Sequence, residues 1–364
     1  MNNNRLYYMD SMRSVLMALG IVLHSSQLFN PERGWRLYHN ESLSLAQYLV
    51  EFIHAFRMPA FFVISGVFFI ITFRKYDFKR FLKVRVNRVL IPLIATALTL
   101  NLLQVYILNT AGWSNIDLSI LINEGEWVSH LWFLINLLIY FIVLAVTLVV
   151  LPEKLKTSLK WLINKIFSMP LFIIILFLPI FSISVLAINK AGVPLYEEFY
   201  GITSLYVILK FIPFFIFGIL LGLNKNYLNR FSSQNILVLS AVVIFLWLAS
   251  TQLTSISSPM IKQLTISYLD SLISWVLILI CFAIFYNFVN SYSKIWENFS
   301  QASYSIYLFH HILVISIGIL LINSTMPAVL AFPLLICLTF FLSYQIHQKL
   351  ILKFKLLRFL YNGK

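Results

Sequence analysis

Charged residues are scarce in this chain. Asp, Glu, Lys and Arg make up 11% of its 364 residues, whereas hydrophobic residues make up 60%. A soluble domain carries about 25% charged residues. The mean hydropathy is +0.87, and several apolar runs reach the ~20 residues that suffice to span a bilayer. These features exclude a soluble globular protein and predict an integral membrane protein with little mass outside the bilayer.

Cysteine is nearly absent, and the two present, Cys281 and Cys337, both lie in apolar runs. They form neither a disulfide framework nor a Cys-x-x-Cys metal pair. The sequence also lacks a Walker-type glycine loop, a Gly-x-Ser-x-Gly turn and a His-Glu-x-x-His zinc motif. We therefore expect no resident metal and no permanently bound cofactor.

The apolar runs predict an all-α polytopic membrane protein with about ten transmembrane helices joined by short loops. A single transmembrane domain is expected over residues 1–364. The predicted spans are approximately 12–29, 48–72, 89–108, 130–151, 170–188, 203–223, 235–253, 267–289, 302–322 and 328–350.

The net charge of +14 does not indicate nucleic-acid binding, because the cations cluster in short segments between apolar runs. With the amino terminus in the cytoplasm, 21 of the 27 lysines and arginines lie on the cytoplasmic side and four on the other. Arg57 and Lys210 lie inside spans. The positive-inside rule therefore predicts that both termini are cytoplasmic.

Ionisable side chains inside a span mark candidate functional sites, because each costs about 2.5–3.5 kcal/mol at the bilayer centre. In the first span, Arg13 and His24 are eleven residues apart, which places them on one helix face about 16 Å apart along the axis. Asp10 and Gly20 fall in the same arc. This stripe connects the cytoplasmic surface with mid-membrane, although a single histidine of this kind is more often a packing residue.

The second span carries Glu51, His54 and Arg57 at three-residue spacing. On one side of a helix, Glu51 can bond His54 or pair with Arg57. Entering from outside, His54 reaches about the same depth as His24. Three ionisable residues within seven are poor candidates for packing alone, so we interpret them as functional.

The ninth span places His310 and His311 about 12–13 Å from the cytoplasmic edge, near the same depth. Adjacent histidines point about 100° apart, so we expect only one of them to face the site, and the sequence leaves open which.

Arg85 and Arg88 end a basic segment and lie three residues apart, on one predicted helix face. Guanidinium groups suit bidentate phosphate binding, and a helix amino terminus would favour it further. From charge alone, an ordinary positive-inside cluster is the more common interpretation.

These segments resemble the acyltransferase-3 family of membrane acyltransferases. The resemblance rests on Arg13 and His24, on the Arg85 and Arg88 pair, and on residues 130–134 (HLWFL) and 304–310 (YSIYLFH). Residues 8–13, 52–58, 61–66 and 83–89 resemble a branch of the family that succinylates periplasmic glucans. The similarity is dense over 7–138 and returns at 303–311.

The resemblance implies an enzyme of the bacterial inner (plasma) membrane with a ten-helix core. It would move a succinyl or acetyl group from cytoplasmic acyl-CoA to a hydroxyl of an extracytoplasmic glucan or polysaccharide. The expected partners are therefore acyl-CoA, this acceptor and the lipid bilayer, with no nucleic acid. The acyl group, the sugar and the formation of a homo-oligomer stay open.

The resemblance also implies a role in acyl transfer for each of these residues. Arg13, Arg85 and Arg88 would hold CoA phosphates; His24 would be general base or transient acyl carrier; His54, Arg57 and His310 would support orientation and oxyanion charge; Glu51 would orient His54. Charge matching adds Arg57 or Lys210 as the partner of a dicarboxylic acyl group.

Two other classes of protein fit the same polar residues. A membrane transporter would use the mid-membrane His and Arg residues to relay protons or bind a solute. A sensor would use its basic face to contact anionic lipid. Consumption of an acyl-CoA by the purified protein separates the enzyme from the transporter.

Overall fold

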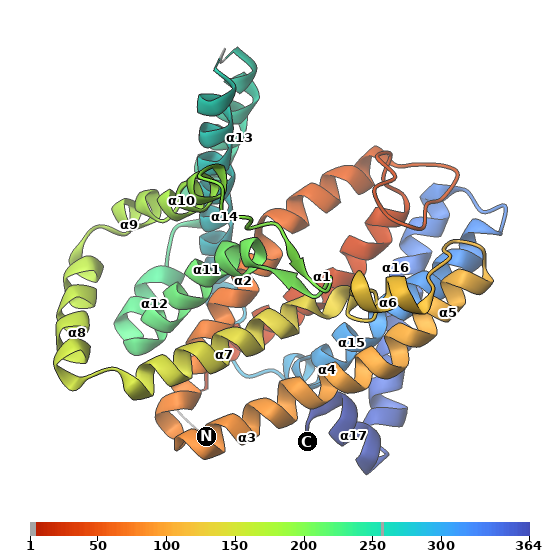
Figure 1. Ribbon diagram of the computed structural model, residues 1–364, viewed down its shortest axis with the longest axis horizontal. Helices are drawn as coiled ribbons and strands as arrows, with labels where there is room; N and C mark the ends of the chain where they lie inside the picture. The colour runs from red at the N-terminus through yellow and green to blue at the C-terminus, as the bar shows by residue number, and fades with distance from the viewer. Residues whose placement is uncertain (1–4, 256–257) are drawn as a thin grey trace.

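The computed structural model describes residues 5–255 and 258–364, which are helical apart from loops and one two-stranded hairpin (Figure 1). The elements, in chain order, are α1 (Tyr7–Leu28), α2 (Ser44–Lys75), α3 (Phe78–Arg85), η1 (Val86–Leu90), α4 (Ile91–Thr96), η2 (Ala97–Asn101), α5 (Leu102–Thr110), α6 (Leu118–Asn123), η3 (Ser129–Leu131), α7 (Trp132–Val150), α8 (Glu153–Ser168), α9 (Leu171–Phe177), α10 (Ile180–Lys190), β1 (Glu198–Phe199), β2 (Thr203–Ser204), α11 (Leu205–Leu223), α12 (Lys225–Ser232), α13 (Ile236–Thr251), η4 (Gln252–Ser255), α14 (Pro259–Phe288), α15 (Lys294–Ile322), α16 (Ala328–Ile346), η5 (His347–Ile351) and α17 (Lys355–Asn362).

The predicted all-α polytopic membrane fold is confirmed. Within the described ranges, 8 helical segments are long and apolar enough to cross a membrane, or up to 9 when α12 and α13, bent by 66°, are taken as one span. Helix covers each of the ten predicted spans. The helix of the first predicted span, α1, is not among the segments that are apolar enough to cross a membrane. It carries the polar residues Asp10, Arg13 and His24.

The polar helix α1 lies inside the bundle, where it packs against α2, α14, α15 and α16. Met9, Met12 and Leu16 on this helix are almost completely buried. Because α1 is enclosed by other helices, its ionisable side chains face protein rather than lipid, which is how such residues are tolerated in a membrane protein.

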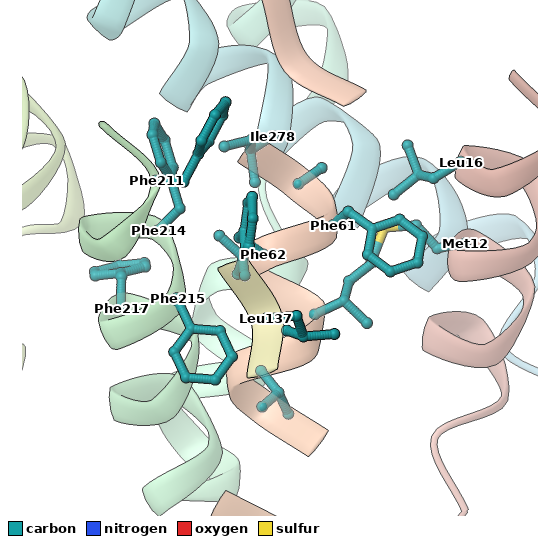
Figure 2. Close-up of a cluster of buried hydrophobic side chains, with 14 of the residues drawn as sticks. Met12, Leu16, Phe61, Phe62, Leu137, Phe211, Phe214, Phe215, Phe217 and Ile278 are labelled. Atoms are coloured by element: carbon teal, nitrogen blue, oxygen red, sulfur yellow. The ribbon is translucent and has the colours of Figure 1, made fainter. Parts of the chain in front are cut away.

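Aromatic residues fill the core around α2. Figure 2 shows Phe61 and Phe62 of α2 between residues of α1, α7, α11 and α14. The Phe62 ring lies 5.0 Å from that of Phe211 and 4.9 Å from that of Phe133. This packing fixes α2, which carries His54 and Arg57, against the rest of the bundle.

The backbones of α2 and α11 touch at two glycines. A Cβ on Gly66 would lie 2.1 Å from the carbonyl oxygen of Phe215, and one on Gly218 would lie 2.0 Å from that of Val63. Small residues of this kind allow the close helix approach that is typical of membrane bundles. Since the obstructing atoms belong to the backbone, no side-chain rearrangement makes room for a larger residue.

We therefore expect Gly218→Ala to destabilise the protein by about 3 kcal/mol or more, because overpacking must push the two helices apart. The melting temperature in detergent should fall by about 5 °C or more. Gly34→Ala is the matched control, since a Cβ on Gly34 meets nothing within 4 Å. Equal melting temperatures for the two variants would contradict the contact.

Pro59 interrupts the hydrogen bonding of α2 next to the candidate site. It has no N–H, so the carbonyl of Ala55, four residues earlier, loses its helical donor. The Ser274 hydroxyl of α14 donates to this oxygen over 2.6 Å. This bond satisfies the freed carbonyl, so it both permits the proline and joins α14 to the segment that carries His54 and Arg57.

Candidate active site

Four histidines from three parts of the chain gather at the inner side of α15. The ring of His24 on α1 lies 5.3 Å from that of His310 and 4.7 Å from that of His311. His130 on η3 lies 5.3 Å from His310 and 4.8 Å from His311, on which it stacks. The Trp35 ring stacks on His24 at 6.1 Å.

The two adjacent histidines of α15 point in different directions, as helical spacing predicts. His310 points to α1, where its Nε2 atom lies 3.0 Å from the position that a Cβ on Gly20 would take. His311 points to α5, where its Nδ1 atom bonds Gln104. The two side chains diverge, and each contacts His24 and His130, the two histidines of the cluster that line the cavity.

Hydrogen bonds at Nδ1 orient three of these rings. The Nδ1 atom of His24 lies 2.7 Å from Oε1 of Gln27, that of His311 lies 2.6 Å from Oε1 of Gln104, and that of His310 lies 2.5 Å from the carbonyl oxygen of Tyr307. With the amide oxygens of Gln27 and Gln104 and the Tyr307 carbonyl turned to the rings, each Nδ1 atom is the donor. A neutral ring then has its lone pair on Nε2.

Arg57 is the unusual charge of the site. Its side chain is 7% exposed, and its Nη1 atom lies 3.6 Å from the same Cβ position on Gly20 that His310 approaches. Its Nε and Nη1 atoms have no hydrogen-bond partner, and it forms no ion pair with any residue that the structure describes. A buried cation without a counter-ion is unfavourable, so this position is suited to an anionic group of a ligand.

A cavity of about 1170 Å³ opens beside this cluster. Its polar lining includes His24, His54, Arg57, His130, Lys210 and Asp270. Binding clefts for small ligands measure about 300–1,000 Å³, so this one can hold several sugar units. Across the described ranges, no three His, Cys, Asp or Glu side chains are placed to hold a metal ion.

The structure brings the second-span residues into this cavity but does not join them as expected. Glu51 and His54 are exposed in the cavity wall. The Glu51 carboxylate accepts a hydrogen bond from the Gln47 amide over 3.2 Å. In the described part of the chain it bonds neither His54 nor Arg57, because the exposed carboxylate turns back along its own helix to Gln47, four residues earlier.

The three predicted phosphate ligands lie away from the cavity, at the amino-terminal end of α1. Arg13 donates to the Ser300 hydroxyl over 3.4 Å and lies 3.8 Å from a carboxylate oxygen of Asp10. The Arg85 guanidinium lies against the Phe81 and Phe141 rings, 5.0 and 4.4 Å from their centroids. Arg88 is exposed.

The helix amino terminus suggested beside Arg85 and Arg88 is corrected by the structure. Residues Phe78–Thr110 form one continuous span, so no helix amino terminus lies beside the pair. A π turn, Val86–Leu90, follows Arg85. Arg85 is partly buried, whereas Arg88 is exposed.

Several residues of the cluster were not predicted as site residues: His130, Gln27, Gln104 and Trp35. His130 lies in the HLWFL segment that carries the family resemblance, and Gln27 follows His24 at the three-residue spacing of neighbours on a helix. Those signals are in the sequence. Gln104 and Trp35 carry none, because only the tertiary packing brings them to the histidines.

Comparisons with known proteins identify the class of protein to which this cluster of histidines and its cavity belong. The acyltransferase-3 family model, described as an acyltransferase domain, matches residues 6–347, so the chain belongs to this family. It is a membrane O-acyltransferase. The resemblance found in the sequence is thereby confirmed, and it favours the enzyme over a transporter.

More narrowly, the chain is similar to proteins named Glucans biosynthesis protein C. It is 30% identical to the one from Salmonella gallinarum (strain 287/91 / NCTC 13346) over an alignment 379 residues long. The alignment covers 99% of this chain and 95% of that protein. The protein of the same name from Salmonella heidelberg (strain SL476) has the same identity and coverage. No solved structure matches the chain.

Proposed function

We propose that this acyltransferase moves a succinyl or acetyl group from cytoplasmic acyl-CoA to a hydroxyl of an extracytoplasmic glucan, in the bacterial inner membrane. The observation that carries the proposal is His24, whose Nδ1 atom bonds Gln27, beside an unpaired buried arginine at a large cavity. The name of the relatives supports a glucan as the acceptor.

In the proposed reaction, His24 is the general base. Its Nε2 atom takes the proton of the acceptor hydroxyl while the hydroxyl oxygen attacks the thioester carbonyl. Arg57 stabilises the negative charge that develops on the carbonyl oxygen. When the tetrahedral intermediate collapses, the C–S bond breaks, the new ester remains, and the thiolate leaving group takes the proton from His24.

The two substrates would reach His24 from opposite sides. The glucan would occupy the cavity that Lys210 and Asp270 help to line. The donor would extend along the face of α1 that carries Arg13, Gly20 and His24, with its phosphates at the amino-terminal end of the helix. Gly20 allows His310 and Arg57 to lie close to this face of α1, because a side chain there would press on both.

Purified protein in lipid nanodiscs tests the proposal directly. With succinyl-CoA or acetyl-CoA and a soluble glucan, we expect release of the CoA thiol together with an acylated glucan detected by mass spectrometry. The same measurement on cell-envelope glycans, with and without the protein, identifies the natural acyl group and sugar. Movement of a solute across vesicles without consumption of the thioester would reject the enzyme and favour the transporter.

Gln27 should act through His24. Replacing it by leucine removes the acceptor of the Nδ1 proton, so the ring loses its fixed tautomer and orientation. We expect kcat to fall about tenfold or more, with an unchanged KM for acyl-CoA. Gln27→Glu, which still accepts this proton, should restore most of the rate.

Gln47→Leu is the matched control for Gln27→Leu, since Gln47 is a partly exposed amide that bonds Glu32 and Glu51. The assignment of Gln27 is wrong if Gln27→Leu and Gln47→Leu turn over at the same rate, or if only the KM for the donor rises.

A further inference from the structure

The last helix of the chain, α17, lies against the amino-terminal end of the span that carries Arg88, where α17 packs on α4. The hydroxyl of Tyr361 bonds that of Thr99 over 2.8 Å, and its ring lies 5.0 Å from that of Phe309. Tyr361 and Asn362 are buried. The end of the chain is therefore held against the bundle.

Gly363 fixes the position of the residue that follows. It ends α17 in the left-handed conformation, with φ of 62°, which glycine adopts without strain at a helix end. A Cβ there would lie 2.2 Å from the carbonyl oxygen of Asn87 and 2.6 Å from the Cα atom of Arg88. The backbone contact thus seats Lys364 beside Arg88.

The result is a group of cations, Arg13, Arg88, Arg358 and Lys364, contributed by three segments. Among the residues that the structure describes, no carboxylate forms an ion pair with Arg88, Arg358 or Lys364. The Nε atoms of Arg13 and Arg358 are buried without a hydrogen-bond partner.

The charges of this group act on one another. Partial burial, followed by the charges of Arg88, Arg13 and Arg358, lowers the pKa of Lys364. Like charges held close together destabilise the unliganded protein. A fold that nevertheless seats them with close backbone contacts is suited to a ligand of high negative charge, and phosphate groups match the donors of Arg and Lys well.

We propose that Arg358 and Lys364, together with Arg13 and Arg88, bind the phosphate groups of the acyl donor. This inference rests on the proposed acyl-CoA donor and extends its site to α17. Residues 355–364 lie outside the segment 6–347 that the family model matches, so family membership does not assign this role to them. Arg85, whose guanidinium lies between two rings, is then a positioning residue of the span rather than a direct phosphate ligand.

Direct binding of CoA to the purified full-length protein in zwitterionic nanodiscs tests the inference. We expect Arg358→Gln and Lys364→Gln each to weaken the Kd for CoA about tenfold, as for the loss of one charge-assisted hydrogen bond. Binding of pantetheine, which has no phosphate, should be unchanged. Lys355→Gln is the matched control, because Lys355 is an exposed cation of the same helix without a contact to the group.

The outcomes separate this inference from the proposed function. If the wild-type protein binds CoA and the two variants bind it equally well, the role of α17 is overturned while the donor stands. If the variants lose affinity only for phosphatidylglycerol vesicles, the cations bind lipid headgroups and the inference fails. If the wild-type protein binds no CoA, the proposed donor fails as well. Unchanged melting temperatures confirm that the variants are folded.

Discussion

His24→Ala is expected to lower the rate of acyl transfer by about 10²–10⁴-fold, the usual contribution of a general base. The reason is local, because His24 has its Nδ1 proton committed to Gln27 and presents Nε2 to the cavity. The affinity for acyl-CoA should stay within about twofold of wild type, because the proposed phosphate ligands lie at the other end of α1. The rate is measured as thiol release coupled to ester formation.

His347→Ala is the control for loss of a buried histidine outside the cavity. His347 lies on η5, and its Nδ1 atom bonds the Ser305 hydroxyl over 2.9 Å. This variant should lose stability without losing the chemical step. Normal transfer by folded His24→Ala protein would reject the assignment of the base.

The same experiment decides between the two roles that the sequence leaves open for His24. A transient acyl carrier would hold the acyl group covalently when acyl-CoA is supplied without an acceptor. As a general base, His24 should leave the protein unmodified under these conditions. Intact-protein mass spectrometry of the wild type, quenched before and after addition of the glucan, distinguishes them.

Arg57→Met should separate activity from stability. We expect transfer to fall about 10²–10³-fold, as when a donor to a developing oxyanion is removed. The melting temperature should not fall, and we expect it to rise, because the wild-type protein buries this charge without a counter-ion. A gain in stability with a loss of activity is common when a functional group is removed from an unfavourable environment.

Lys190→Met serves as the control for loss of a cation, since Lys190 is exposed at the end of α10. It should change neither quantity. An Arg57→Met variant that transfers at the wild-type rate would exclude the oxyanion role. A marked loss of stability would show instead that Arg57 has a structural partner.

The sequence alone determined the class of fold and the family, and it predicted part of the candidate site. The length of the apolar runs predicted an all-α membrane protein because the hydrophobic thickness of a bilayer fixes how many residues a span needs. The helical period placed Arg13, Gly20 and His24 on one face, since that spacing is set by backbone geometry. The short motifs identified the family, and with it the acyltransferase.

Contacts between distant segments were decided only by the tertiary structure. Helical spacing gives the direction in which His310 and His311 point, but not that α1 and α5 lie on those two sides. The residue types do not predict the π turn that follows Arg85. Glu51 stood at a spacing that allowed a bond with His54, yet Gln47 competes for it on the same helix.

The proposed donor site shows the same division. The basic residues at the end of the chain looked like an ordinary cytoplasmic cluster, because charge counts do not reveal which cations meet. Only the close approach of Gly363 to the backbone of Asn87 and Arg88 places Lys364 in the group. The spacing of residues along one helix can be taken from the sequence. Contacts between segments far apart in the chain depend on how whole helices pack.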